Sequence, residues 1–191
     1  AGAAPIKHGG DRMAVIVSDN GGNFERVPTG MQHAVCANVF DLGIIPGYQG
    51  VMQHKGVMLF ELEARRTEGE FAGKRFLVSK SYTMSLNEKA NLRKDLASWR
   101  GRDFTEDELK GFDLEKVVGV NCNLNLIPVE KNGKTYANIA SINPVMNGQE
   151  RLVPEVEPYY TPEWIKTMLH KEELPTAVSK PSADFEDDIP F

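Results

Sequence analysis

Positively charged and aromatic side chains gather in the middle of the chain. Between Lys55 and Arg102 there are eleven Lys and Arg against six Asp and Glu, whereas the whole chain of 191 residues has a formal charge of −5. Cations that bind phosphates, together with ring faces on which bases stack, are what holds a single polynucleotide strand. We therefore predict a binding surface, with all its cations on one face, from Lys55, Arg65, Arg66, Lys74, Arg75 and Lys80 for phosphates and from Phe71, Phe76 and Tyr82 as platforms.

A second basic and aromatic group follows in the sequence Lys131-Asn132-Gly133-Lys134. Asn-Gly supplies the positive φ of a tight two-residue hairpin turn, so Lys131 and Lys134 flank a turn between two strands. Tyr136 lies just beyond them and is the fourth candidate platform. The core remains an alternative for Phe76, Tyr82 and Tyr136, and we assign Phe60 and Trp99 to the core.

The last eight residues are acidic with apolar anchors and contain no Lys or Arg. Carboxylates that repel one another and too few apolar groups predict a segment that stays solvated. Such a peptide can place Ile189 and Phe191 in a hydrophobic pocket rimmed by Lys or Arg. We predict a partner-binding tail rather than a frayed terminus, made of Asp184, Phe185, Glu186, Asp187, Asp188, Ile189, Pro190 and Phe191.

Catalytic, metal and membrane functions find little support. Cys36 and Cys122 each lie among apolar residues, which favours buried thiols over a disulfide, and the four histidines are scattered. The acidic cluster 103–108 falls where a helix begins and acids favour the helix dipole. There is no phosphate-cradling loop of the pattern Gly-x-x-x-x-Gly-Lys-Ser or Gly-x-x-x-x-Gly-Lys-Thr and no apolar run that could span a bilayer. We expect a cytoplasmic protein that is not an enzyme and has no metal or cofactor.

The strands and helices that position these groups can be predicted from hydrophobic periodicity and from capping residues. Period-2 alternation predicts strands at 31–42, 54–64, 74–83, 120–126 and 135–142. On the first, Ala34, Cys36, Phe40 and Leu42 share one face. Ser-x-x-Glu and Thr-x-x-Glu capping boxes at Ser85 and Thr105 predict two helices between the third and fourth strands. This order is that of the OB-fold, a mainly β, five-stranded Greek-key barrel with a helical insert.

The chain divides into four predicted regions. Residues 1–30 form a flexible N-terminal segment, of which 1–12 precede Met13 and are interpreted as added for expression. Residues 31–145 form the barrel, 146–173 an extension and 174–191 the disordered tail. A short helix is expected at 161–170, with Pro162 in its first turn. Its apolar residues would pack on the barrel or on another subunit: Trp164, Ile165, Met168 and Leu169.

The sequence also contains five short segments that can be compared with the sequences of known protein families. They are Tyr-Thr-Met-Ser-Leu at 82–86, Glu-Lys-Ala-Asn-Leu-Arg-Lys-Asp-Leu at 88–96, Ser-Trp-Arg-Gly at 98–101, Gly-Phe-Asp at 111–113 and Gly-Lys-Thr-Tyr-Ala-Asn-Ile at 133–139. In these segments the chain resembles a family of bacteriophage-encoded single-stranded DNA-binding proteins with an OB-fold. Its end, Asp-Asp-Ile-Pro-Phe, is similar to the tail of bacterial single-stranded DNA-binding proteins.

The resemblance implies replication or recombination work on phage DNA without base specificity. It implies single-stranded DNA as one partner and replication or recombination proteins, held by the tail, as others. The body of the chain departs from the cellular proteins, so their tetramer is not carried over, although a homo-oligomer remains open. Two alternatives are an adaptor whose barrel holds a protein, and an RNA-binding protein that uses the same surface.

Overall fold

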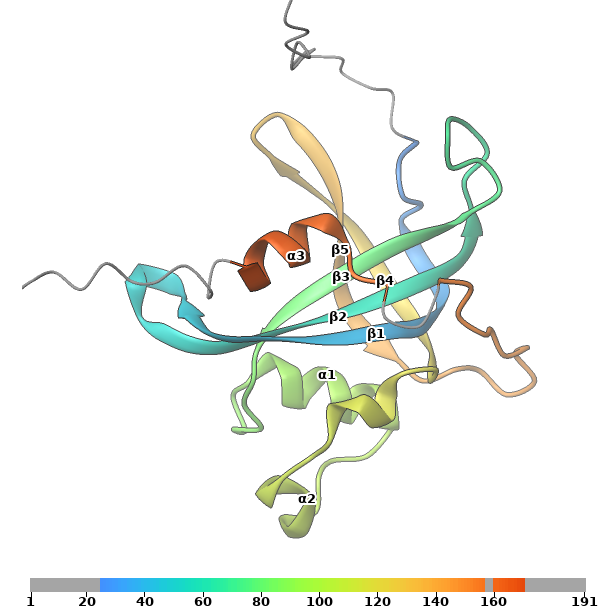
Figure 1. Cartoon of the computed structure of the whole chain (residues 1–191). Coiled ribbons are helices and arrows are strands. Elements are labelled where there is room, and N and C mark those ends of the chain that lie inside the picture. The colour runs from blue at the N-terminus through green and yellow to red at the C-terminus, as the bar shows by residue number, and fades with distance from the viewer. Residues whose placement is uncertain (1–24, 157–159, 171–191) are drawn as a thin grey trace, which may run out of the picture.

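The computed structural model describes residues 25–156 and 160–170 (Figure 1). The predicted partner-binding tail and most of the predicted N-terminal segment lie outside these ranges. The chain is mainly β and forms one antiparallel sheet of five strands in the order β3-β2-β1-β4-β5. These strands are β1 (Gly30–Pro46), β2 (Met52–Arg65), β3 (Arg75–Thr83), β4 (Asn121–Lys131) and β5 (Lys134–Asn143).

The helices occupy the connections and the C-terminal extension. α1 (Asn91–Arg100), α2 (Glu106–Lys110) and the 3-10 turn η2 (Leu114–Val117) lie between β3 and β4. A short 3-10 turn, η1 (Tyr48–Gly50), joins β1 to β2, and α3 (Glu163–His170) follows the last strand. The five predicted strands and their order along the chain are confirmed.

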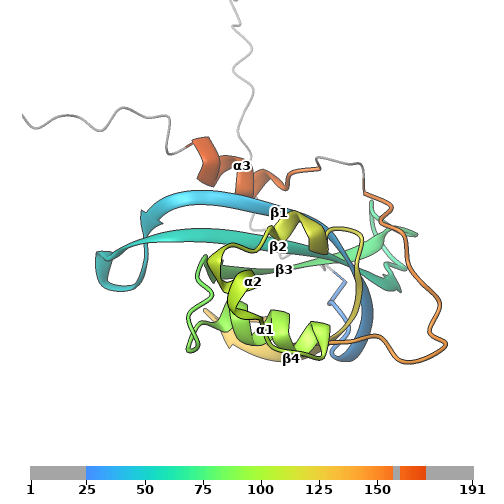
Figure 2. The same cartoon turned by 90° about the horizontal axis from the view of Figure 1, so that it is seen from below.

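β1 is the strand on which the sheet depends. Residues 34–46 pair with β2, while residues 30–35 pair with β4 along the other edge. The sheet curls, so that its outer strands β3 and β5 approach each other and α1 packs against both. One side of the curled sheet faces α1 and the other side faces α3 (Figures 1 and 2).

A β-bulge at Ala37 changes which side chains of β1 face the main core. Cys36 pairs with Phe60 and Asn38 with Leu59, so Ala37 is the extra residue. A single inserted residue moves every following side chain to the opposite face. Ala34 and Cys36 enter the main core, whereas Phe40 and Leu42 face α3. The prediction that these four residues share one face was therefore wrong.

The main core lies between the sheet and α1. Leu92, Leu96 and Trp99 from α1 are buried against strand residues that include Phe60. The rings of Phe60 and Trp99 are 5.9 Å apart between centroids, and the indole Nε1 donates to the Asn121 carbonyl at 2.8 Å. The assignment of both aromatic residues to the core is confirmed. Cys36 and Cys122 are buried free thiols, as predicted.

The two predicted capping boxes have different outcomes. At Thr105, the side chain accepts from the Glu108 N–H and the Glu108 carboxylate accepts from the Thr105 N–H, as predicted. At Ser85, the hydroxyl instead accepts from the Asn87 N–H at 3.1 Å, and α1 begins only after Ala90. Ser side chains compete with helices by bonding nearby backbone groups, and this local bond replaces the predicted cap.

Candidate nucleic-acid interface

The β4–β5 hairpin presents one exposed face that combines apolar, aromatic and basic side chains. Directly opposed residues of an antiparallel pair share a face, and side chains alternate along each strand. The register pairs Val129 with Tyr136 and Lys131 with Lys134. Tyr136 is 52% exposed, and Ile127 and Val129 are also exposed on this face. The hairpin therefore carries a ring, two aliphatic neighbours and two cations on a single surface.

The predicted turn between the two lysines is confirmed. Asn132 and Gly133 have φ values of 54° and 71°, as a tight two-residue turn requires. The turn places Lys131 and Lys134 directly opposite each other, and neither pairs with a carboxylate of the described residues. Like charges at opposed positions destabilise a hairpin. An anion between the two ammonium groups relieves this repulsion.

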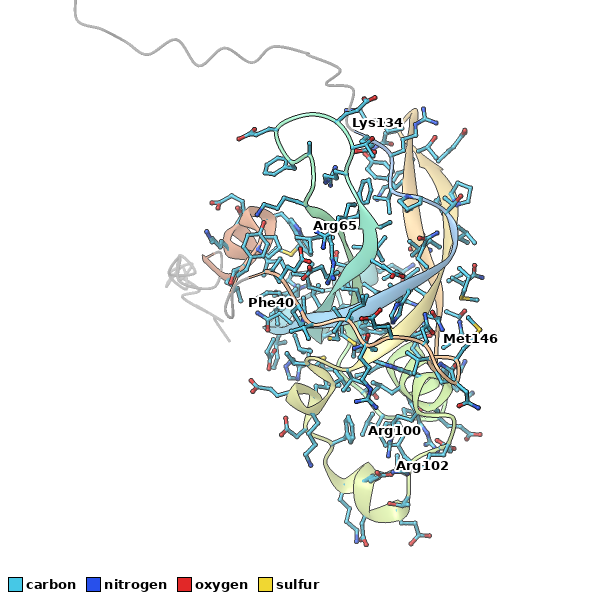
Figure 3. The ribbon with its side chains drawn as sticks, turned by 90° about the vertical axis from the view of Figure 1, so that its right-hand side faces the viewer. Phe40, Arg65, Arg100, Arg102, Lys134 and Met146 are labelled. Carbon is cyan, nitrogen blue, oxygen red and sulfur yellow. The ribbon has the colours of Figure 1, made fainter. Side chains whose placement is uncertain are left out.

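The β2–β3 loop forms a second exposed group at the same end of the molecule, opposite α1 and α2 (Figures 1 and 3). Phe71 is 53% exposed at the loop tip, and Lys74 is exposed and near enough to Glu155 for its charge to help lower the pKa of that carboxyl. The Arg66 guanidinium lies 4.5 Å from the centroid of the Phe76 ring and covers it. Phe76 is thus 2% exposed, and its prediction as a stacking platform is corrected because no ring face is open.

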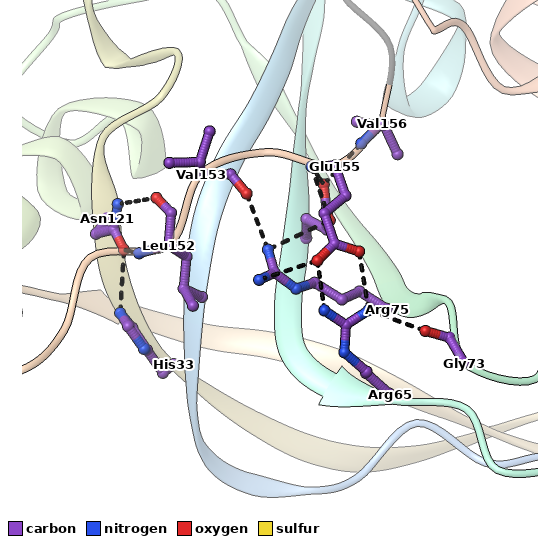
Figure 4. Close-up of polar contacts among 10 residues, drawn as sticks. His33, Arg65, Gly73, Arg75, Asn121, Leu152, Val153, Glu155 and Val156 are labelled. Carbon is purple, nitrogen blue, oxygen red and sulfur yellow. Dashed lines mark hydrogen bonds and ion pairs between the residues drawn. The ribbon is translucent and has the colours of Figure 1, made fainter.

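Arg65 and Arg75 hold a segment of the chain itself. The strap, defined as residues 149–156, crosses β1 and reaches the β2–β3 edge (Figure 4). Arg65 donates to both carboxylate oxygens of Glu155, and Arg75 donates to the Val153 carbonyl at 3.0 Å. The bond from Arg65 holds the pKa of Glu155 below its usual value. Both arginines were predicted to bind phosphates, but in the structure they are engaged within the chain.

The hollow beside the strap has no excess of positive charge. Its volume is about 510 Å3, and it lies between the strap and β2–β3. Three arginines and three glutamates line it: Arg65, Arg75, Arg151, Glu63, Glu150 and Glu155. Because these charges balance, the hollow does not attract a polyanion.

Lys80 and Tyr82 are joined to α1 through Asp95. The Asp95 carboxylate accepts from the Tyr82 hydroxyl at 2.8 Å and pairs with the Lys80 ammonium at 2.6 Å. Tyr82 is 4% exposed, and burial together with the nearby carboxylate raises the pKa of its phenol. Tyr82 therefore belongs to the core, and its prediction as a platform is corrected in the same way as that of Phe76.

The predicted cations do not form one surface, contrary to expectation. Lys55 donates to the Thr83 hydroxyl at 2.8 Å, away from the hairpin tip. Figure 3 shows Lys134 at one end of the molecule, Arg100 and Arg102 at the other, and Arg65 between them. Six of the eleven basic residues between Lys55 and Arg102 pair with carboxylates: Arg65, Arg75, Lys80, Arg93, Arg100 and Arg102.

The structure adds two hairpin residues to the predicted set. Ile127 and Val129 extend the apolar surface beside Tyr136, because β4 continues to Lys131 instead of ending near Leu126. The alternation of Ile127, Val129 and Lys131 with Pro128 and Glu130 is the sequence signal that identifies this extension.

Neither a protein-family model nor a curated protein matches the sequence. Within residues 25–156 and 160–170, no cluster of three or more His, Cys, Asp or Glu is arranged to hold a metal ion. None of the helices described is long and apolar enough to cross a membrane.

Proposed function

We propose that the chain binds single-stranded DNA without base specificity, through the exposed face of the β4–β5 hairpin and the β2–β3 loop. The observation that carries this proposal is the shared face of Tyr136, Lys131 and Lys134. A ring that is half exposed offers a stacking surface for any base, and two unpaired ammonium groups beside it attract phosphates. The pairing of six other cations with carboxylates makes those cations less available to phosphates.

The strand order supports an OB-fold as the scaffold. In a Greek key, three consecutive strands are followed by a fourth that lies beside the first. The order β3-β2-β1-β4 has this property, and β5 then extends the sheet beside β4. In OB-folds, the connection between the fourth and fifth strands flanks the oligonucleotide-binding face. The hairpin with Tyr136 is that connection here.

The acidic C-terminal segment completes the proposed function. The residues from Asp184 to Phe191 recruit replication or recombination proteins through Ile189 and Phe191, as the resemblance to bacterial tails implies. The segment also competes with DNA for the cations of the body, because both are polyanions. Removing it is expected to leave the affinity for single strands unchanged or stronger, while capture of partner proteins is lost.

The test is an equilibrium titration of the full chain with oligo-dT at several salt concentrations. Tyr136→Ala should weaken binding by about 1–3 kcal/mol, the range for one base stacked on a ring. Lys131→Gln/Lys134→Gln should lower the slope of log K against log salt by about 1.4, because each phosphate contact with a single strand contributes about 0.7.

A control variant removes two lysine charges at a place outside the proposed interface. Lys110→Gln/Lys116→Gln lies in α2 and η2, at the end opposite the hairpin, and should leave the slope unchanged. If wild type fails to shift any single strand at low salt, the proposed function is wrong and the adaptor alternative gains support. Competition between oligo-dT and oligo-U separates DNA binding from RNA binding.

A further inference from the structure

α3 carries an exposed apolar stripe on the side that faces away from the sheet. Trp164 is 43% exposed and Met168 is 41% exposed. Residues four apart in a helix lie one above the other, so these two side chains form a continuous patch. Tyr160, just before the helix, is 44% exposed as well. Two of the exposed aromatic side chains of the described residues therefore lie in this short segment.

The opposite side of α3 fixes the helix in place. Ile165 is fully buried and Leu169 is partly buried, and they pack with Phe40, Leu42, Val57 and Leu59 on β1 and β2. Burial of a side chain such as Ile165 contributes about 1.5–3 kcal/mol. These contacts fix α3 on the sheet. The side chain of Trp164, which is next to Ile165 in the sequence, is therefore kept exposed to solvent. The alternative in which all four apolar residues of this helix pack on the barrel does not apply to Trp164 and Met168.

The place of α3 makes this patch relevant to nucleic-acid binding. α3 covers the outer side of the β1–β2–β3 layer, away from α1 (Figure 2). In an OB-fold, the face of the second and third strands receives the oligonucleotide. Under α3 that face is aliphatic at Val57, Leu59 and Leu77, and the ring of Phe40 on the neighbouring β1 is only 8% exposed. Among the described residues of the C-terminal extension, Tyr160 and Trp164 carry exposed rings.

Local charge permits a polyanion to approach the patch. Glu163 is the acidic residue of the described helix, and its carboxylate pairs with the Lys166 ammonium at 3.2 Å. No carboxylate of residues 160–170 is left without a cation. Within residues 160–170, no unpaired carboxylate therefore opposes the approach of a phosphate.

We propose that α3 forms part of the single-strand interface and that Trp164 is a stacking platform for an unpaired base. This inference rests on the proposed function and extends the interface from the hairpin and the β2–β3 loop to the opposite side of the sheet. The aromatic surface is then supplied by α3 instead of by the strands beneath it. Because Trp164 is already exposed, α3 does not have to move for a base to stack on it.

The two tryptophans of the chain make the test selective. Trp99 is 5% exposed, and its indole N–H is bonded to the Asn121 carbonyl. Trp99 is thus shielded from added DNA, and a change in tryptophan emission reports on Trp164. Titration of the full chain with oligo-dT should quench the emission of wild type and leave the emission of Trp164→Phe unchanged.

Affinity measured with labelled oligo-dT provides the second readout. Trp164→Ala should bind roughly 5- to 150-fold more weakly, the effect of losing one stacked base. Trp164→Phe keeps a ring and should retain most of the affinity. Val118→Ala is the control, because it trims an equally exposed apolar side chain outside the proposed interface, and it should bind as wild type does. Circular dichroism confirms that each variant is folded.

Three results would overturn the inference. In the first, wild type binds oligo-dT while Trp164→Ala binds equally well and no quenching occurs, which leaves the proposed function intact. In the second, Trp164→Ala converts an oligomer to a monomer in sedimentation without changing DNA affinity, which assigns the patch to a second copy of the chain. In the third, wild type does not bind oligo-dT, and then the proposed function fails together with the inference.

Discussion

Glu61 and Glu155 are 94 positions apart, yet the carboxylate of Glu61 accepts the backbone N–H of Glu155 at 2.9 Å. The same carboxylate accepts the Val156 N–H at 3.2 Å and lies 3.5 Å from the Arg75 guanidinium. Glu61 is 1% exposed, so these contacts replace all of its hydration. A buried acid on β2 therefore fixes the strap across the sheet.

Removing this acid should destabilise the chain strongly. Glu61→Ala leaves two N–H groups of the strap without their acceptor and Arg75 with one carboxylate fewer, and removal of one member of a buried ion pair costs about 3–5 kcal/mol. We expect a loss near the lower end of this range, because Glu155 still pairs with Arg75 at 3.3 Å. Urea unfolding monitored by circular dichroism measures this loss in the free energy of unfolding.

Glu70→Ala provides the comparison for this experiment. Glu70 is exposed in the β2–β3 loop, and substitutions at such sites change stability by less than about 0.5 kcal/mol. If Glu61→Ala were as stable as Glu70→Ala, the strap would not depend on the buried carboxylate.

Stability should fall in acid in part because of Glu108. The Arg102 guanidinium, followed by the Thr105 N–H and Arg100, holds the pKa of Glu108 well below its usual value. A carboxyl group whose pKa is lower in the folded state stabilises the fold above the pKa of the unfolded chain, about 4.3. This contribution is lost as the pH falls below that value and through the folded pKa.

The melting temperatures of wild type and Glu108→Gln should therefore converge in acid. At neutral pH the variant should melt at a lower temperature, and the difference should narrow progressively below about pH 4.3. Glu130→Gln, on the exposed hairpin, should show no such convergence. A difference that stays constant from neutral to acid pH would argue against an ionised Glu108 as the cause.

The two cysteines should be unreactive while the chain is folded. Burial raises the pKa of the Cys36 thiol to about 12 and also raises the pKa of Cys122, and the thiolate is the reactive form. A disulfide reagent at mildly alkaline pH should modify neither residue in the native protein and both after unfolding in guanidinium. Rapid modification of a native thiol would show that the main core opens.

Local sequence patterns predicted where the strands and turns lie better than they predicted which side of the sheet each side chain faces. Alternation located all five strands, and the Asn132-Gly133 turn and the Thr105 cap follow from chemistry within a few residues. The bulge at Ala37 could not be foreseen, since it depends on how β1 pairs with β2. This one residue decides that Phe40 faces α3 and not the main core.

The candidate interface was harder to predict because several of its cations pair with carboxylates that lie outside the basic stretch. The positive excess in the middle of the sequence is reduced by acids from outside that stretch: Glu155 pairs with Arg65, Asp103 with Arg93 and Glu108 with Arg100. Counting charges along a window cannot reveal these partners. Lys131 and Lys134 were predicted beside the hairpin turn because turn chemistry alone places them there, whereas the core remained an alternative for Tyr136 until the strand pairing and exposure were known.

The central position of β1 also shapes how the chain is made on the ribosome. During synthesis, β1 can form a hairpin with β2 soon after both have left the exit tunnel. Its N-terminal half must wait for β4, which follows only after β3 and the helices of the insert. Until then, this stretch of β1 offers an unpaired edge to other nascent chains, which is the situation in which aggregation competes with folding.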